Sequence, residues 1–218
     1  MEWMIDTANL ADVRVALDTF PLVGVTTNPT ILKAELPMNY VEHLRALRGL
    51  VGDRTLHVQL GAETCEGMLA EADWLREVVD KDIYVKVPVT EEGLKAIRQL
   101  KTRGVNVTAT AIYYPLQGML AAAAGADYLA PYCNRMEQNE IDFGRAIGEI
   151  RRLIDRDGYQ AKILAASFKN AGQVVKAIDS GAHAVTAQPA TLRSVLKSAL
   201  VADAVAVFNA DQRLAKGE

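Results

Sequence analysis

The stretch Ile83-Tyr84-Val85-Lys86-Val87-Pro88-Val89 is the most informative part of this sequence. Its β-branched and apolar residues predict a buried strand. Side chains alternate along a strand, so Tyr84, Lys86 and Pro88 share one face and the branched aliphatic residues share the other. Lys86 therefore points toward whatever the sheet encloses.

A lysine in such a strand has two readings. Burial removes the hydration that only the charged form enjoys, so it lowers the pKa of Lys86 from about 10.4 and releases the neutral amine. A neutral amine is a nucleophile toward carbonyl groups and can form a Schiff base. The alternative is structural: the stem of Lys86 is buried and its charged head reaches water at the end of the strand.

The composition predicts one globular domain, which we expect to span residues 1–218. Its 27 acidic residues face 24 basic ones, and no basic run indicates a nucleic-acid or membrane partner. The N-terminus lacks a basic segment followed by an apolar one, so we expect a cytoplasmic protein. Cys65 and Cys133 form no C-x-x-C pair, which indicates neither a disulfide framework nor a zinc site.

Short apolar runs alternate with amphipathic stretches along the whole chain. The runs predict strands at 3–5, 23–26, 55–59, 83–87, 106–111, 128–131, 162–165 and 184–187. The stretches between them predict helices at 10–19, 40–50, 65–79, 91–103, 116–124, 142–157, 173–180 and 191–199. About eight β-then-α units predict an α/β protein with a (β/α)8 TIM barrel. An open doubly wound sheet is the alternative, although no Gly-x-Gly-x-x-Gly follows a strand.

Catalytic groups of such barrels gather where the strands end. A (β/α)8 barrel enzyme should therefore have polar residues at the ends of its predicted strands. Seven consecutive predicted strands do end in polar groups. Taken singly, each has a structural alternative, such as a helix cap or a turn. The groups are Asp6, Asn28, Gln59, Lys86, Thr110, then Tyr132 with Arg135, and Ser167 with Lys169.

Motifs spread over essentially the whole chain resemble the small transaldolase-like family of class I aldolases. They are Asp6, Gly24-Val25-Thr26-Thr27-Asn28-Pro29, Val85-Lys86-Val87-Pro88, Thr110-Ala111, Ala130-Pro131-Tyr132-Cys133-Asn134-Arg135 and Ala165-Ala166-Ser167-Phe168-Lys169. The resemblance implies a barrel enzyme that uses neither metal nor cofactor and in which Lys86 forms the Schiff base. The sequence has no His-x-His or His-Glu-x-x-His, which also argues against a metal-dependent aldolase.

Three positions resemble the aldolases of this family more than its transaldolases. Gln59 stands where the transaldolases carry glutamate, Tyr132 where the large ones carry phenylalanine, and Lys169 where the small ones usually carry arginine. The implied reaction is the reversible cleavage of fructose 6-phosphate to dihydroxyacetone and glyceraldehyde 3-phosphate. A transaldolase that transfers the dihydroxyacetone unit is the closer alternative, and a non-catalytic barrel that binds sugar phosphates is the more distant one.

The resemblance also implies residue roles. Tyr132, Gln59 and Thr110 would hold a water, with Tyr132 as general acid and base. Asp6 and Asn28 would orient the donor hydroxyls. Ser167 would help to hold the donor or the phosphate end. Arg135 and Lys169 would supply positive charge where the acceptor phosphate lies.

Some features depart from the family pattern. Residues 136–142 follow Arg135 without the glycine that relatives often have there. His57 and Tyr84 are polar at inward positions below Gln59 and Lys86, where apolar filling is expected. A buried imidazole or phenol needs a partner, so we predict that these two side chains hydrogen-bond to each other.

The tail from Val201 to Glu218 continues after the last predicted unit of the barrel. A partial apolar stripe of Ala204, Val205, Phe208 and Leu214 predicts an intersubunit arm. The resemblance implies homo-oligomers, in which rings of five pair into decamers. The alternative is a helix folded back on its own barrel.

Overall fold

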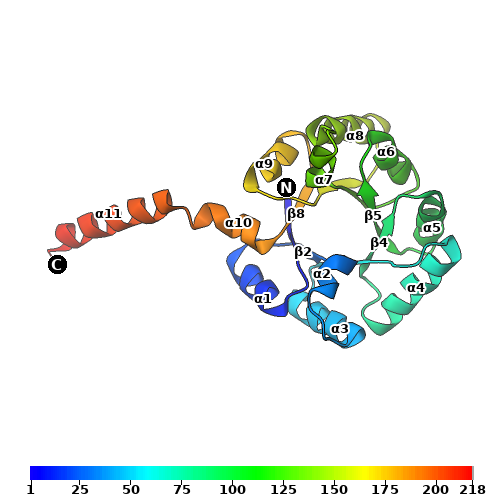
Figure 1. Ribbon diagram of the computed structural model, residues 1–218, viewed down its shortest axis with the longest axis horizontal. Helices are drawn as coiled ribbons and strands as arrows, with labels where there is room; N and C mark the ends of the chain where they lie inside the picture. Colours follow the sequence, from blue (N-terminus) through cyan, green and yellow to red (C-terminus); the bar gives the residue numbers. More distant parts are fainter. Residues whose placement is uncertain (218) are drawn as a thin grey trace.

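Eight parallel strands form a closed barrel in which each strand pairs with its neighbours in chain order and the last pairs with the first (Figure 1). The structure is a computed structural model, and it describes residues 1–217. The barrel confirms the (β/α)8 prediction. Its strands are β1 (Glu2–Asp6), β2 (Gly24–Thr26), β3 (Thr55–Gln59), β4 (Tyr84–Pro88), β5 (Asn106–Ile112), β6 (Tyr128–Pro131), β7 (Lys162–Ala165) and β8 (Ala184–Ala187).

Helices surround the barrel on its outer face (Figure 1). Those predicted from periodicity agree with the structure to within about three residues at each end. They are α1 (Leu10–Thr19), α3 (Tyr40–Val51), α4 (Cys65–Val78), α5 (Glu91–Thr102), α6 (Pro115–Ala123), α8 (Phe143–Asp157), α9 (Ala171–Asp179) and α10 (Pro189–Leu196). Two short helices, α2 (Pro29–Lys33) and α7 (Cys133–Gln138), were not predicted, and both directly follow predicted site residues.

Capping side chains define where many of the helices begin. An Asn, Asp or Thr oxygen accepts a backbone N–H of the first turn, which satisfies a donor that the helix itself cannot. The capping residues are Asn9, Asn28, Asn39, Thr64, Thr90, Asp142 and Asn170.

The apolar residues separate into two clusters by strand parity. Val85 and Val87 belong to the large cluster between the sheet and the helices. Met4, Tyr128, Leu164 and Ala184, with other inward side chains, fill the barrel itself. Tyr84 packs on this inner cluster, so the predicted alternation along β4 is confirmed and Lys86 lies on the enclosed face.

The predicted His57–Tyr84 hydrogen bond is wrong. The two rings are stacked, with centroids 4.6 Å apart and an interplanar angle of 16°. His57 Nδ1 instead lies 2.8 Å from Thr108 Oγ1, and Nε2 lies 3.0 Å from Thr55 Oγ1. Both ring nitrogens are therefore satisfied by threonine hydroxyls, one on β5 and one on β3 itself, while Tyr84 on β4 contacts the imidazole through its ring face.

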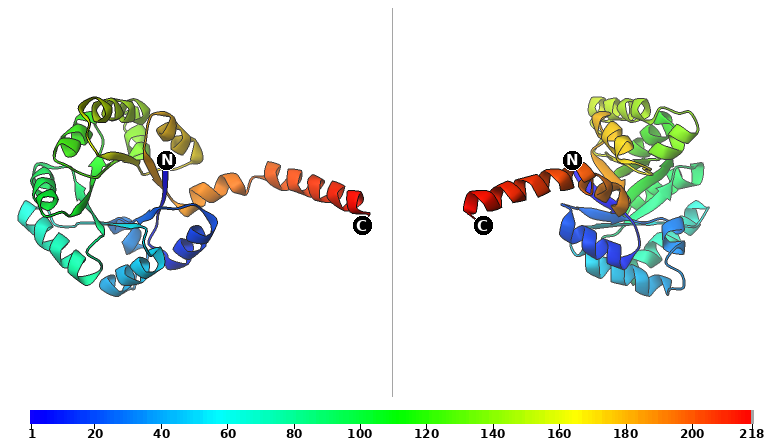
Figure 2. Two further views of the ribbon diagram at one scale, coloured as in Figure 1. Left: turned by 180° about the vertical axis from the view of Figure 1, so that it is seen from behind. Right: turned by 60° about the vertical axis from the view of Figure 1, so that its left-hand side comes forward.

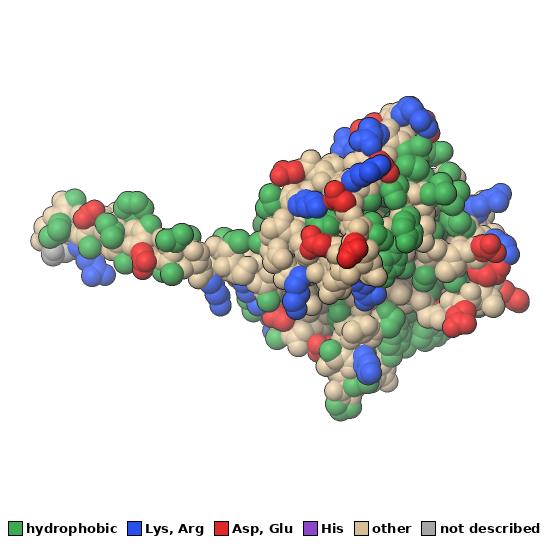
Figure 3. All heavy atoms as spheres, turned by 45° about the horizontal axis from the view of Figure 1, so that its top comes forward, with side chains coloured by type: hydrophobic (Ala, Val, Ile, Leu, Met, Phe, Trp, Pro, Cys, Tyr) green, Lys and Arg blue, Asp and Glu red, His purple; other side chains and the backbone are tan. Residues whose placement is uncertain are grey.

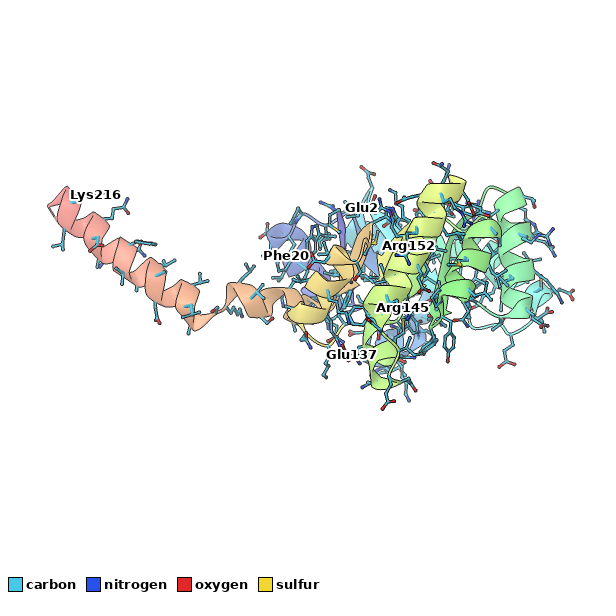
Figure 4. All side chains as sticks on the ribbon, turned by 90° about the horizontal axis from the view of Figure 1, so that it is seen from above. Glu2, Phe20, Glu137, Arg145, Arg152 and Lys216 are labelled. Atoms are coloured by element: carbon cyan, nitrogen blue, oxygen red, sulfur yellow. The ribbon has the colours of Figure 1, made fainter. Side chains whose placement is uncertain are left out.

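The two ends of the barrel are distinct in the side view (Figure 4). Glu2, at the start of β1, lies at one end, and Glu137, on α7 after β6, lies at the opposite end. All strands are parallel, so the end marked by Glu137 is where every strand finishes. The predicted polar groups belong to that end.

The last helix, α11 (Ala199–Lys216), leaves the barrel and projects away from it (Figures 1 and 2). No residue of α11 is buried in the described part of the chain. Hydrophobic side chains are exposed along it among a few charged ones (Figure 3). The helix thus does not fold back on its own barrel. Within residues 1–217, no helix combines the length and the apolar character needed to cross a membrane.

Candidate active site

A cavity of about 350 Å³ opens at the end of the barrel where the strands finish. It brings together seven of the nine predicted site residues: Asp6, Asn28, Gln59, Lys86, Tyr132, Arg135 and Ser167. A larger hollow of about 640 Å³ lies on the outer surface against α5 and is lined by Lys95, Arg98 and Lys101 among others. We assign the site to the smaller cavity because the polar groups of six strands converge there.

Lys86 reaches the cavity from the middle of β4. It is only 6% exposed, and its Nζ donates a hydrogen bond to the carbonyl oxygen of Thr27 at 2.6 Å. Burial lowers the pKa of Lys86, and the carboxylate of Asp6 opposes that shift by favouring the charged form. The amine thus lies in a place that favours its nucleophilic form, at an opening large enough for a small substrate.

Asp6 ends β1 and is held by hydroxyl groups. Thr26 Oγ1 donates to Asp6 Oδ1 at 2.7 Å and lies 2.8 Å from Thr186 Oγ1. Because Thr26 has one proton and gives it to Asp6, Thr186 is the donor in the second bond. Burial raises the pKa of Asp6, while Lys86 and the Thr26 hydrogen bond lower it. The sequence reasoning missed both threonines, although inward parity on β2 and β8 was available to indicate them.

Tyr132 and Thr110 form a hydroxyl pair beside the lysine, with their oxygens 2.9 Å apart. Burial raises the pKa of Tyr132, so its phenol is protonated at neutral pH. Thr110 is fully buried behind Tyr132. Gln59 Oε1 is buried and has no hydrogen-bond partner among residues 1–217, so it is an acceptor that a substrate hydroxyl or a water would satisfy.

The strand β5 is irregular next to Thr110. The register between β5 and β6 shifts between Ala109 and Ile112, and Ala111 within the shift has φ of 59°. An L-residue in the left-handed region costs about 1–2 kcal/mol. Such strain is often kept where a bulge redirects a functional side chain, and here it adjoins Thr110.

The side chain of Asn28 caps a helix with its oxygen and lines the cavity. Its Oδ1 accepts the N–H of Ile31 at 3.0 Å and so begins α2. This leaves the Nδ2 donor for the cavity that Asn28 lines. The cap explains why α2 starts directly at Pro29, since proline is favoured in the first turn.

The opposite wall carries positive charge. Arg135 lies on α7 and Ser167 follows β7, and both line the cavity. The Arg135 guanidinium carbon lies 5.0 Å from the centre of the Tyr132 ring. Lys169 is exposed and is not among the lining residues, so the structure does not bring its side chain to the cavity as predicted. Lys169 lies two residues after Ser167, whose φ is 62°.

Besides Thr186, six further residues line the cavity that were not predicted as site residues: Pro29, Thr30, Ile31, Ala166, Phe168 and Gln188. Gln188 directly follows β8 and Phe168 lies three residues after the end of β7, so position after a strand was a usable signal for them. Within residues 1–217, no group of three or more His, Cys, Asp or Glu side chains is placed to hold a metal ion.

Comparisons with known proteins identify a family and a fold for this chain. A family model described as transaldolase/fructose-6-phosphate aldolase matches residues 3–217. A protein of Streptococcus pneumoniae (strain ATCC 700669 / Spain 23F-1), named "Probable fructose-6-phosphate aldolase", is 46% identical over 212 residues, which cover 97% of this chain and 96% of that protein. The match extends over the whole barrel and the tail.

A solved structure is similar in fold. It is a "putative fructose-1,6-biphosphate aldolase" from Coccidioides immitis, with a TM-score of 0.57 and 20% identity. The similarity covers 87% of this chain and 74% of that one. At this identity the likeness concerns the barrel fold alone.

Proposed function

Because the chain belongs to the transaldolase/fructose-6-phosphate aldolase family, we propose that it is a class I aldolase that reversibly cleaves fructose 6-phosphate to dihydroxyacetone and glyceraldehyde 3-phosphate. The observation that carries this proposal is Lys86, a buried amine at the mouth of a cavity beside a carboxylate and a phenol. The family itself supports an aldolase chemistry, and the Schiff base is the part that needs testing.

Carbon–carbon cleavage begins with Lys86. The neutral Nζ attacks the C2 ketone, and loss of water gives an iminium. The C4 hydroxyl then loses its proton, the C3–C4 bond breaks, and its electron pair moves to the iminium nitrogen. Glyceraldehyde 3-phosphate leaves, and the remaining enamine is protonated at C3. Hydrolysis releases dihydroxyacetone and restores the lysine.

Proton transfer falls to Tyr132. Its phenol lies within hydrogen-bond distance of the Thr110 hydroxyl. In our proposal these two groups and Gln59 hold the water that carries protons to and from the substrate. Gln59 has both a donor and an acceptor, so it orients that water without exchanging a proton itself. In the cleavage direction Tyr132 gives its proton as water leaves the carbinolamine and recovers one from the C4 hydroxyl. It then gives that proton to C3 of the enamine and recovers one from the water that hydrolyses the iminium.

Two walls of the cavity fit the two ends of the substrate. Asp6 and the Asn28 amide face the donor hydroxyls, which need directional hydrogen bonds. Arg135 and Ser167 form the wall for the phosphate, because a guanidinium fork binds two phosphate oxygens at once. The exposed Lys169 adds positive charge outside the cavity rather than a contact inside it.

Borohydride trapping tests the Schiff base. With dihydroxyacetone present, reduction should attach a covalent adduct to the peptide that contains Lys86 and abolish activity. Lys86→Met should be inactive, whereas the exposed Lys95→Met should behave as wild type. An adduct found only on other lysines, or full activity in Lys86→Met, would overturn the proposal.

Product analysis separates the two family reactions. Incubated with fructose 6-phosphate alone, an aldolase releases free dihydroxyacetone, whereas a transaldolase needs an acceptor such as erythrose 4-phosphate. A barrel that only binds sugar phosphates does neither. Turnover in the presence of a chelator tests the metal independence that belongs to the same proposal.

The proposal extends to location and assembly. Cys65 and Cys133 are both free and buried, which suits the reducing cytoplasm that we propose. The exposed apolar residues of α11 support a homo-oligomer, with rings of five pairing into a decamer as the family resemblance implies. Its partners would be sugar phosphates and hydroxyketones, with no nucleic acid and no membrane among them.

A further inference from the structure

Gln173, on the outer helix α9, is one of the few buried polar side chains of the described residues, at 6% exposure, and no step of the proposed mechanism uses it. It lies in the first turn of α9, where its backbone N–H is already satisfied by Asn170 Oδ1 at 3.0 Å. Burying a primary amide requires that its acceptor and both donors find partners. The partners of Gln173 therefore indicate what it holds.

All three side-chain bonds of Gln173 go to the segments that carry the positive wall of the cavity. Oε1 accepts the backbone N–H of Lys169 at 2.7 Å. Nε2 donates to Asn134 Oδ1 at 3.2 Å and to Glu137 Oε2 at 2.5 Å. One amide thus joins the loop after β7 to the helix α7.

These two segments hold the anion-binding side chains. Arg135 lies on α7 between Asn134 and Glu137, and Ser167 lies two residues before Lys169. The segments also meet through the backbone, since the N–H of Asn134 donates to the carbonyl oxygen of Ser167 at 2.8 Å. Ser167 adopts φ of 62°, a left-handed conformation that persists only where neighbouring contacts enforce it.

We infer that Gln173 is a positioning residue that fixes Arg135 and Ser167 at the spacing needed to bind the phosphate end of the substrate. The inference rests on the proposed function and assigns the recognition of that end to a buried clamp outside the cavity. Only an amide serves here, because one acceptor must face the Lys169 N–H while two donors face Asn134 and a carboxylate.

The geometry provides a charge-swap experiment. Gln173→Glu keeps the shape of the side chain, but it removes both donors and places a second carboxylate against Glu137. In Gln173→Glu/Glu137→Gln, the new amide at 137 donates to the new carboxylate at 173, which still accepts from the Lys169 N–H. The double variant therefore restores the hydrogen bond between positions 173 and 137, with the donor and the acceptor exchanged.

Aldol synthesis from dihydroxyacetone gives the readout, with glyceraldehyde 3-phosphate compared with unphosphorylated glyceraldehyde as acceptor. We expect Gln173→Glu to raise KM for the phosphorylated acceptor about tenfold, the size of one lost hydrogen bond to a charged group, and to leave KM for glyceraldehyde nearly unchanged. The swap should bring the phosphorylated acceptor back to within about threefold of wild type.

Equal losses for both acceptors, or a swap that fails to rescue, would overturn the inference. If Gln173→Glu does not fold, Glu137→Ala removes one bond of the clamp from an exposed position and should raise the same KM, in the same acceptor-selective way. A wild type that does not prefer the phosphorylated acceptor would refute the phosphate wall itself, and the clamp with it. A wild-type preference that survives in the variants would refute the clamp alone.

Discussion

Lys86 and Asp6 form the central residue pair of this molecule, and burial shifts their pKa values in opposite directions. Desolvation is the largest influence on both, and it lowers the pKa of Lys86 while it raises the pKa of Asp6. Their mutual attraction acts against desolvation at each residue. A charge added to the cavity would shift the pKa values of both residues. Replacing a neutral lining residue with a charged one should therefore change the reaction.

Gln59 is the position where such a replacement is most informative. We predict that Gln59→Glu loses aldol cleavage and gains transaldolase turnover with erythrose 4-phosphate, because a carboxylate exchanges protons and an amide does not. The new charge also favours protonated Lys86, so the acid limb of kcat/KM should move to higher pH. Assaying free dihydroxyacetone and transferred product over a pH series measures both effects.

Two controls accompany this substitution. Gln188→Glu places the same charge at another lining position, far along the ring of strands, and should keep the ratio of the two activities. Tyr132→Phe should lose most activity of both kinds, because it removes the proton donor but no charge. If Gln59→Glu has an unchanged ratio, position 59 does not select the reaction.

His57 gives a prediction on stability rather than activity. Burial, and then the charge of Lys86, lower the pKa of His57 to about 3, against 6.5 in the unfolded chain. Above pH 6.5 neither state binds this proton, and between 6.5 and 3 only the unfolded state does, so stability falls as the pH falls. We expect a loss of about 2 kcal/mol from this group between pH 7 and pH 5.

Urea unfolding at pH 7 and pH 5 measures that loss. His57→Gln should be less stable than wild type at pH 7, since a buried ring is removed, but its further loss at pH 5 should be about 2 kcal/mol smaller. A wild type and a His57→Gln variant with the same pH dependence would show that His57 does not titrate on unfolding.

At the scale of elements, what the sequence could predict followed from periodicity and parity. The run around Lys86 alternates so regularly that the strand, its inward face and the burial of the lysine on that face were all predictable from it. The helices α2 and α7, of five and six residues, are too short to show a helical period, and they were missed. Side-chain partners such as Gln173 and Glu137 are distant in sequence, so no local pattern indicates them.

The bulge in β5 permits a prediction of its own. Ala111, with φ of 59°, occupies a conformation in which glycine is not strained. Ala111→Gly should therefore raise the free energy of unfolding by about 0.5–1 kcal/mol. This value is the backbone strain that glycine relieves, reduced by the entropy that glycine adds to the unfolded chain. Ala109→Gly, in the same strand without positive φ, should lower it by about 1 kcal/mol. Equal losses in the two variants would contradict the strain assigned to the bulge.

At the scale of the whole molecule, the barrel and the arm differ in how they are stabilised. The barrel closes on itself, so every strand has two partners and the apolar faces of the surrounding helices are covered. Nothing within residues 1–217 buries α11, although Leu200, Phe208 and Leu214 on it are 80%, 68% and 75% exposed. Most of the stability of a helix in a protein comes from packing of its apolar face, so the apolar stripe of α11 needs a second surface.

We predict that a second copy of the chain supplies that surface. A chain ending at Ser198 lacks α11 and should have a lower oligomer mass by light scattering than the full chain, while its barrel still folds. Phe208→Glu should weaken assembly in the same direction, because it places a charge in an interface that Phe208 would fill. Ala206→Glu adds the same charge two residues earlier, on the side of the helix opposite Phe208, and should assemble as wild type. An unchanged mass for the shortened chain would show that α11 does not join subunits, and the exposed stripe would then have to be covered by another protein.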